Sequence, residues 1–200
     1  AGLAAEGVPP AEIAARIQAM FTNLFDSPML ALGVQGMRVG LGLALIWIFR
    51  RFVDKRSFRA LGFQMPRGWL KEFGAGVALV MVMWLVIFAL SLVTGAARVT
   101  GLAWQSSDAF AILGALAFGF GFNVLVGIIE EADARGYMLQ NLAEGMRFAP
   151  AVVVSSAYFG ILHLLNPGAG LLSTLGIFFA GITLALGYYL TGRLWFSIGM

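Results

Sequence analysis

Residues 109–130 read AFAILGALAFGFGFNVLVGIIE, and the first charged side chain in this stretch is Glu130. The stretch stays mostly apolar to Ala143, interrupted by charges between Glu130 and Arg135. A helix needs about 20 residues to cross the hydrocarbon core of a bilayer, which is about 30 Å thick. At about 1.5 Å per residue the whole stretch measures roughly 50 Å, so it must tilt, bend or extend beyond the bilayer. Three glycines offer places to bend: Gly119, Gly121 and Gly127.

Four further stretches are apolar and long enough to cross a bilayer, and a sixth begins at about Leu194. Asn166-Pro167-Gly168 is expected to end the fourth, because proline lacks a backbone donor and glycine frees the turn. The sequence therefore predicts an all-α fold, a polytopic transmembrane helix bundle with five spans plus the start of a sixth. The five predicted spans cover residues 29–49, 73–94, 109–143, 149–165 and 171–190.

The composition agrees with a membrane protein. Of the 200 residues, 60% are hydrophobic and 12% are charged, against about 25% charged residues in soluble domains. So few charges exclude an ordinary cytosolic enzyme, a disordered tail and a nucleic-acid-binding protein. The chain has no cysteine, which excludes a disulfide framework, a thiol nucleophile and Cys-ligated zinc.

The basic residues predict the orientation. Residues 50–71 hold seven of the thirteen lysines and arginines, and basic loops favour the cytoplasmic side. The Arg50–Lys71 loop is therefore expected to be cytoplasmic and the amino terminus outside. Because this basic segment lies beside a span, we interpret it as a lipid-facing anchor and not as a nucleic-acid site. We expect a multi-pass protein of a bacterial cytoplasmic membrane.

The first 28 residues form a separate predicted unit. Apolar residues recur at helical spacing between Ile13 and Phe25, after Pro9-Pro10 as a start signal. We interpret residues 1–28 as an extracytoplasmic amphipathic lead-in that lies on the membrane surface, in preference to a gate for substrate. Residues 29–200 form the predicted transmembrane domain.

A charged cluster interrupts the third span, and ionisable groups inside a membrane are functional candidates by default. On a helix, Glu131 and Arg135 are one turn apart and can pair. Glu130 lies about 100° round the same helix, away from that cation, and Asp133 is one turn along from Glu130. A carboxylate in a poorly solvated cavity is suited to act as a general base for water.

His163 is the only histidine of the chain. It lies about fourteen residues into the fourth span, roughly 20 Å from its cytoplasmic start. Glu130 lies about thirteen residues from the cytoplasmic end of the third span. Antiparallel neighbours would hold the two side chains at similar depth, which predicts a shared site. A buried ion pair that locks two helices, with a merely hydrogen-bonded histidine, is the alternative.

Other reaction chemistries lack their motifs. The chain has neither a His-Glu-x-x-His zinc motif nor a Gly-x-Ser-x-Gly nucleophile elbow. Glu130, Glu131 and His163 are capable of binding zinc, and the sequence does not decide between a metal ion such as zinc and a metal-free water.

Glu130-Glu131-x-x-x-Arg135-Gly136-Tyr137, followed by Phe159-x-x-x-His163, resembles the first two motifs of the CPBP family of CAAX proteases and bacteriocin-processing proteins. The flanking segments 61–70 and 187–196 also resemble this family, and the likeness covers roughly residues 50–200. It implies an all-helical membrane protease that cleaves peptide bonds near the cytoplasmic leaflet. Glu130 would activate water with help from His163, while Glu131 and Arg135 would order the site. Ala134 replaces the family's usual aromatic residue, and Asp133 is an additional charge.

The resemblance predicts an intramembrane endopeptidase whose partners are the lipid bilayer and a peptide or protein substrate, without nucleic acid. A non-catalytic protein of the same fold, acting in bacteriocin self-immunity or as a scaffold, is the alternative. A proton-coupled transporter is the third hypothesis, but it calls for ionisable groups on several spans.

Hydrolysis also needs donors for the oxyanion. With Arg135 paired to Glu131, none is left over on the third or fourth span. We therefore expect these donors on the sixth span, within about ten residues after Met200 at the helical rise per residue. The family pattern suggests a histidine and, four residues later, an asparagine there. On this hypothesis the 200 residues are catalytically incomplete, truncated before the third motif.

The orientation can be tested independently of the family. Cysteines introduced at Ser57 and Ser106 should differ in their reaction with a membrane-impermeant thiol reagent on intact cells. We expect labelling at position 106 and protection at position 57, because the intervening span crosses the membrane once. The opposite pattern would overturn the orientation.

Overall fold

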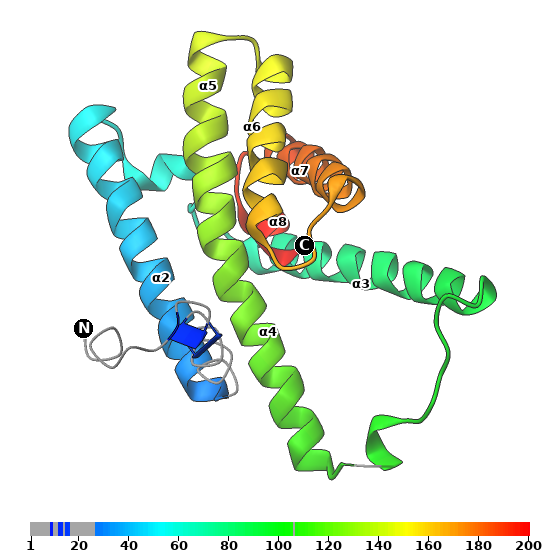
Figure 1. The fold of residues 1–200 in the computed structure, drawn as a ribbon. Helices are drawn as coiled ribbons and strands as arrows, with labels where there is room; N and C mark the ends of the chain where they lie inside the picture. The colour runs from blue at the N-terminus through cyan, green and yellow to red at the C-terminus, as the bar shows by residue number, and fades with distance from the viewer. Residues whose placement is uncertain (1–8, 10–11, 14, 17–26, 106) are drawn as a thin grey trace.

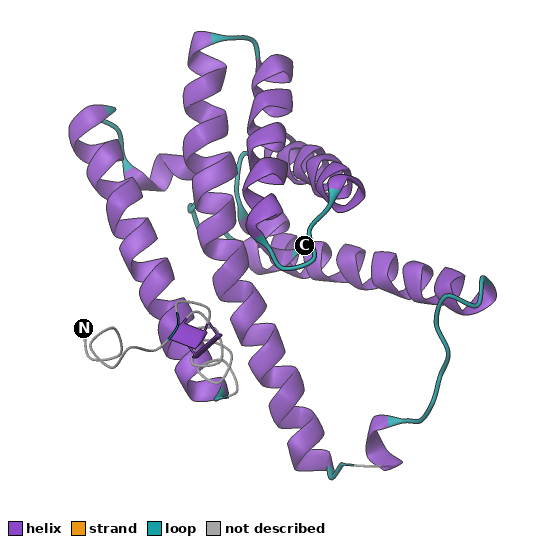
Figure 2. Cartoon of the chain, viewed as in Figure 1, coloured by secondary structure: helices purple, strands orange, loops and turns teal. Residues whose placement is uncertain are grey.

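The computed structural model describes residues 9, 12–13, 15–16, 27–105 and 107–200, and every regular element within them is helical (Figure 2). This confirms the all-α class. Most of the amphipathic helix predicted between Ile13 and Phe25, and with it most of the 1–28 lead-in, lies outside the described residues. The boundary between the two predicted units stays a prediction.

Five helices of the described chain are long and apolar enough to cross a membrane, which makes this a multi-pass membrane protein. Their bounds lie within a few residues of the predicted ones. The first joins α2 (Pro28–Ile48) to the π-helical segment η2 (Phe49–Val53), and the second is α3 (Trp69–Val93). The fourth is α6 (Phe148–Leu162) with the 3-10 turn η6 (His163–Leu165), and the fifth is α7 (Leu171–Thr191). Short 3-10 turns η3 (Phe58–Leu61) and η4 (Ala103–Gln105) lie in the connections.

The third span is one continuous helix of 37 residues. It consists of α4 (Ala109–Glu131), the π-helical segment η5 (Ala132–Met138) and α5 (Leu139–Gly145), which follow one another along a single rod in Figure 1. The helix passes through all three glycines that were expected to offer bends. Its departure from α geometry lies instead at the charged segment that follows Glu131.

Side chains and turns fix the helix ends. The Asp108 carboxylate accepts a hydrogen bond of 2.8 Å from the Ala111 amide and so caps α4, and Ser27 caps α2 in the same way. After η6 the chain turns at Asn166, and Gly168 has a φ of 75°, a conformation that glycine adopts without strain. The predicted stop of the fourth span is thus observed.

The short helix α8 (Trp195–Gly199) packs against three longer ones. It contacts α3, α4 and α7, while α2 lies along α4, and α6 packs against α7 (Figure 1). Trp195 donates a hydrogen bond of 2.7 Å to the Gln64 carbonyl, and Arg193 forms an ion pair with Glu72 at the start of α3. The start of the predicted sixth span is therefore fixed to α3.

A second polar group ties the first span to the third. Arg50 in η2 is buried and donates hydrogen bonds to Gln140 (2.8 Å) and Asn141 (3.2 Å) on α5. Gln140 in turn donates to the Leu61 carbonyl at 2.9 Å. These bonds hold the two parallel helices at one end, next to the basic loop.

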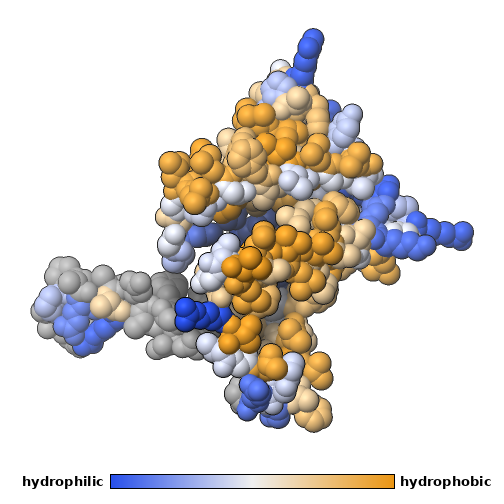
Figure 3. Space-filling model, turned by 90° about the vertical axis from the view of Figure 1, so that its right-hand side faces the viewer, coloured by the Kyte–Doolittle hydropathy of each residue, from blue (hydrophilic) through white to orange (hydrophobic). Residues whose placement is uncertain are grey.

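Much of the outer surface is apolar. In Figure 3 hydrophobic side chains cover most of the face shown, and hydrophilic ones gather mainly at its margins. Large apolar residues such as Trp84 and Phe88 on α3 are more than half exposed. Such a surface is unfavourable in water and suits contact with lipid.

The close approach of α3 and α8 depends on Gly76. A methyl group there would meet the Phe196 carbonyl and the backbone of Gly199, whereas one at Gly74 on the same helix would meet nothing within 4 Å. We expect Gly76→Ala to lower the free energy of unfolding by about 1–3 kcal/mol through overpacking. Gly74→Ala should leave it unchanged or raise it by up to about 1 kcal/mol. Equal unfolding curves for the two variants in detergent would contradict this packing.

Candidate functional site

A buried ion pair lies at the junction of α4 and η5. The Arg135 guanidinium donates a hydrogen bond of 2.7 Å to the Glu131 carboxylate, and the two side chains are 2% and 3% exposed. Arg135 also donates to the Gly181 carbonyl on α7 at 3.0 Å and lies 4.3 Å from the centre of the Phe159 ring on α6. The predicted Glu131–Arg135 pair is therefore present, and it joins three spans.

The pair lies where the helix changes from α to π geometry. The seven residues of η5 form this π segment, and Arg135 and Gly136 within it are buried. π-helical segments are rare and frequently occur at functional sites. Prediction from a 3.6-residue period has no means of detecting such a segment.

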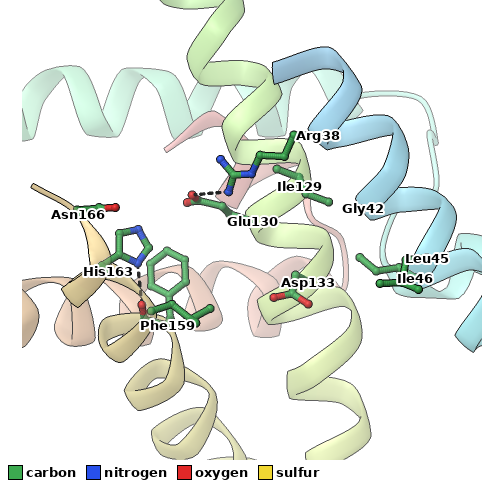
Figure 4. A pocket seen from close by; sticks show the side chains of 11 residues that line it. Arg38, Gly42, Leu45, Ile46, Ile129, Glu130, Asp133, Phe159, His163 and Asn166 are labelled. Atoms are coloured by element: carbon green, nitrogen blue, oxygen red, sulfur yellow. Dashed lines mark hydrogen bonds and ion pairs between the residues drawn. The ribbon is translucent and has the colours of Figure 1, made fainter. Parts of the chain in front are cut away.

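Glu130 and His163 line one cavity of about 390 Å³ between α2, α4 and α6. In Figure 4 the Glu130 carboxylate lies between the Arg38 guanidinium and the His163 ring. Glu130 and His163 thus lie on the same cavity, as their predicted depths suggested, and Asp133 lines it beside Glu130. The residues that line the cavity are Arg38, Gly42, Leu45, Ile46, Ile129, Glu130, Asp133, Phe159, Leu162, His163 and Asn166.

The imidazole of His163 has a defined hydrogen-bond pattern. His163 follows the last residue of α6, and its Nδ1 lies 2.7 Å from the Phe159 carbonyl oxygen. A carbonyl only accepts, so Nδ1 carries the proton and Nε2 of the neutral ring has a free lone pair. The ring also lies against the Phe159 ring, with 4.5 Å between centroids. His163 thus offers the cavity an acceptor.

Arg38 is the cavity residue that sequence reasoning missed. It belongs to the first span, and its guanidinium lies 3.8 Å from the Glu130 carboxylate. The charged side chain in an otherwise apolar span was the available signal, but its partner lies 92 positions away in the chain. Glu130, expected to lack the cation of its own helix, faces a cation from a neighbouring helix.

Glu131 and Arg135 do not line this cavity. Glu131 borders a second cavity of about 650 Å³, lined mostly by apolar side chains of α3, α4 and α8. Glu130 and Phe159 line both cavities. The four predicted site residues therefore divide into two that face the smaller cavity and a buried pair behind them.

The described residues do not fit a zinc site by themselves. Catalytic zinc takes three protein ligands and an open position. No three histidine, aspartate or glutamate side chains of the described chain come together in a way that could hold a metal ion.

Neighbouring glutamates should respond differently to the same substitution. Glu131→Gln leaves the buried Arg135 without its counter-ion, and we expect the free energy of unfolding to fall by about 3–5 kcal/mol. Glu130→Gln should cost less than about 1 kcal/mol, because its partner Arg38 is 57% exposed. Titration with a denaturing detergent measures the free energy of unfolding of both variants. A larger loss for Glu130→Gln would contradict the division of the site.

Residues 112–200, which include both charged motifs, match the family described as type II CAAX prenyl endopeptidase Rce1-like. No curated protein and no solved structure matches the chain significantly. The match confirms the resemblance carried by the Glu130–Tyr137 and Phe159–His163 segments. Over residues 112–200 the chain is therefore similar to the Rce1-like family of type II CAAX prenyl endopeptidases.

Proposed function

We propose that the protein is an intramembrane endopeptidase in which Glu130 and His163 activate water for hydrolysis of a peptide bond. The observation that carries this proposal is their position on one cavity within the spans. The family match, which covers both residues, supports the reaction class.

The hydrogen-bonding properties of the two side chains suit a single water molecule. The Glu130 carboxylate accepts, and so does Nε2 of His163, because its Nδ1 proton is directed to the Phe159 carbonyl. A water that donates one hydrogen bond to each keeps its oxygen lone pairs free to attack. His163 then orients the water and Glu130 acts as the general base.

The reaction proceeds through a tetrahedral intermediate. The water oxygen bonds to the carbonyl carbon, one water proton passes to Glu130, and the C=O π electrons move to the carbonyl oxygen. When this pair re-forms the C=O bond, the C–N bond breaks and the leaving nitrogen takes the proton from Glu130. The products are a carboxylic acid and an amine, and Glu130 is again a carboxylate.

Glu131 and Arg135 order the site without touching the water. Their pair, together with the Gly181 carbonyl and the Phe159 ring, fixes α4 against α6 and α7. Catalytic groups must be held within a fraction of an ångström by their surroundings. The pair thereby keeps Glu130 on α4 opposite His163 at the start of η6.

The substrate of the proposed reaction is a membrane-associated peptide or protein. The larger, mostly apolar cavity borders Glu130 and suits a hydrophobic part of such a substrate. The family description names a CAAX prenyl endopeptidase, which favours a prenylated CAAX peptide as the substrate. With the Arg50–Lys71 loop on the cytoplasmic side, we expect substrates to approach from the cytoplasm.

The test is cleavage of a quenched fluorescent, farnesylated CAAX peptide by the full-length protein in liposomes. We expect Glu130→Gln and His163→Ala each to reduce kcat by at least about 100-fold, since general acid–base groups contribute about 10²–10⁴-fold. Both variants should keep the unfolding midpoint of the wild type. Arg51→Gln, which removes an exposed charge at the end of the first span, is the control.

Wild-type activity that persists in both variants would contradict the proposed roles. A folded wild type that cleaves neither this peptide nor other membrane-associated peptides would favour the non-catalytic alternative.

A further inference from the structure

Asp133 is the additional charge of the third span, and the proposed reaction gives it no role. It follows Glu130 by three residues and lines the same cavity as Glu130 and His163. In Figure 4 it lies further along the rod of α4 and η5, near Leu45 and Ile46 of α2. None of the ion pairs between the described residues includes the Asp133 carboxylate. An acidic side chain without a counter-ion therefore lies beside the proposed general base.

The charges around this cavity do not balance. Its charged lining residues are Arg38, Glu130 and Asp133, and Arg38 pairs with Glu130 across 3.8 Å. The ring of His163 is neutral, and the buried ion pair behind the cavity is neutral as a whole. One negative charge is left over, on Asp133. An uncompensated charge within a span is costly, so a cation supplied by a ligand would be bound favourably there.

We infer that Asp133 binds a lysine or arginine side chain of the substrate next to the scissile bond and so contributes to specificity. The inference rests on the proposed function, because Glu130 and His163 set the position of the scissile bond. Three residues of helix rise about 4.5 Å, and an extended peptide advances about 3.3 Å per residue. The basic side chain therefore belongs to one of the two substrate residues nearest the scissile bond on either side.

The walls of the cavity suit such a side chain. Leu45, Ile46 and Leu162 are apolar, and lysine and arginine bury their alkyl stems along apolar surface while the charged end reaches a polar group. An apolar surrounding also lowers the effective dielectric constant, which makes an ion pair stronger than it is in water. The same carboxylate would repel an acidic side chain of the substrate.

A metal ion suits this carboxylate less well than a substrate cation does. No three histidine, aspartate or glutamate side chains of the described residues come together to hold a metal. An ammonium or guanidinium group needs only one carboxylate to form a charge-assisted hydrogen bond. The unbalanced charge of the cavity therefore favours a basic peptide side chain.

The experiment measures cleavage of farnesylated CAAX peptides by the full-length protein in neutral phosphatidylcholine liposomes. Mass spectrometry first locates the bond that is cleaved. Matched peptides then carry lysine, glutamine or glutamate at each unmodified position among the four residues around this bond. At one position at least, the wild type should cleave the lysine peptide with a kcat/KM about 10- to 100-fold above that of the glutamine peptide, as expected for a charge-assisted hydrogen bond. The glutamate peptide should be the poorest substrate.

Asp133→Asn keeps the shape of the side chain and removes its charge. We expect the lysine preference to fall below about threefold, mainly through a higher KM for the lysine peptide, because an interaction that binds substrate and transition state equally is seen in KM. Cleavage of the glutamine peptide should keep the kcat/KM of the wild type. Asp133→Glu, which keeps the charge, should retain a preference for lysine.

Glu144→Gln is the matched control. It also removes a carboxylate from the third span, but Glu144 lies about 16 Å further along the helix and forms an ion pair with Arg56. This variant should show the lysine preference of the wild type. A preference lost equally in Glu144→Gln and Asp133→Asn would reflect the net charge of the protein and would contradict the inference.

The remaining outcomes separate the inference from the proposed function. Equal cleavage of the lysine and glutamine peptides by the wild type at every tested position would overturn the inference. A lysine preference that persists in Asp133→Asn would overturn it as well, and so would an equal loss of kcat on all peptides, which indicates a part in the reaction itself. If Glu130→Gln abolishes cleavage, the proposed function stands in each of these cases. Activity retained by Glu130→Gln would contradict the proposed function.

Discussion

The buried pair between Glu131 and Arg135 is the interaction on which the rest of the site depends. A charge inside a bilayer is costly unless it is paired and hydrogen-bonded, and Arg135 meets this demand with groups from its own helix, α6 and α7. The contacts of Arg135 with the Gly181 carbonyl and the Phe159 ring can therefore form only when these three spans are in register. That register places Glu130, one residue before the pair, on the wall opposite His163.

Small residues and polar contacts at the helix ends support this arrangement. The approach of α8 to α3 needs the missing side chain of Gly76, and Gly127 gives α8 similar access to α4. At the basic end, Arg50 of η2 joins the first span to α5 through two amide side chains. The Arg50 contacts and the packing of α2 against α4 together place Arg38 beside Glu130.

Most of the fold could be predicted because the bilayer imposes a simple rule on the sequence. Runs of about 20 apolar residues become spans, and the bounds of all five agree with the structure within a few residues. The Glu131–Arg135 pair was predictable because residues four apart on a helix are neighbours. The contact of Arg38 with Glu130 was not, since it joins two helices whose packing no local period encodes. The π geometry of residues 132–138 could not be predicted for a related reason. Arg135 in this segment contacts α6 and α7, and such contacts between helices leave no local pattern in the sequence.

The central claim is that Glu130 and His163 act together on one water, and a double-variant cycle tests it most directly. Groups that act as a unit show strongly non-additive losses. The account predicts that the double variant, Glu130→Gln with His163→Ala, has a kcat/KM no more than about threefold below that of the less active single variant. Residues that share a partner show coupling energies large enough for such an effect. Losses that multiply, so that the double variant falls by the product of the two single effects, would show independent action and contradict the account.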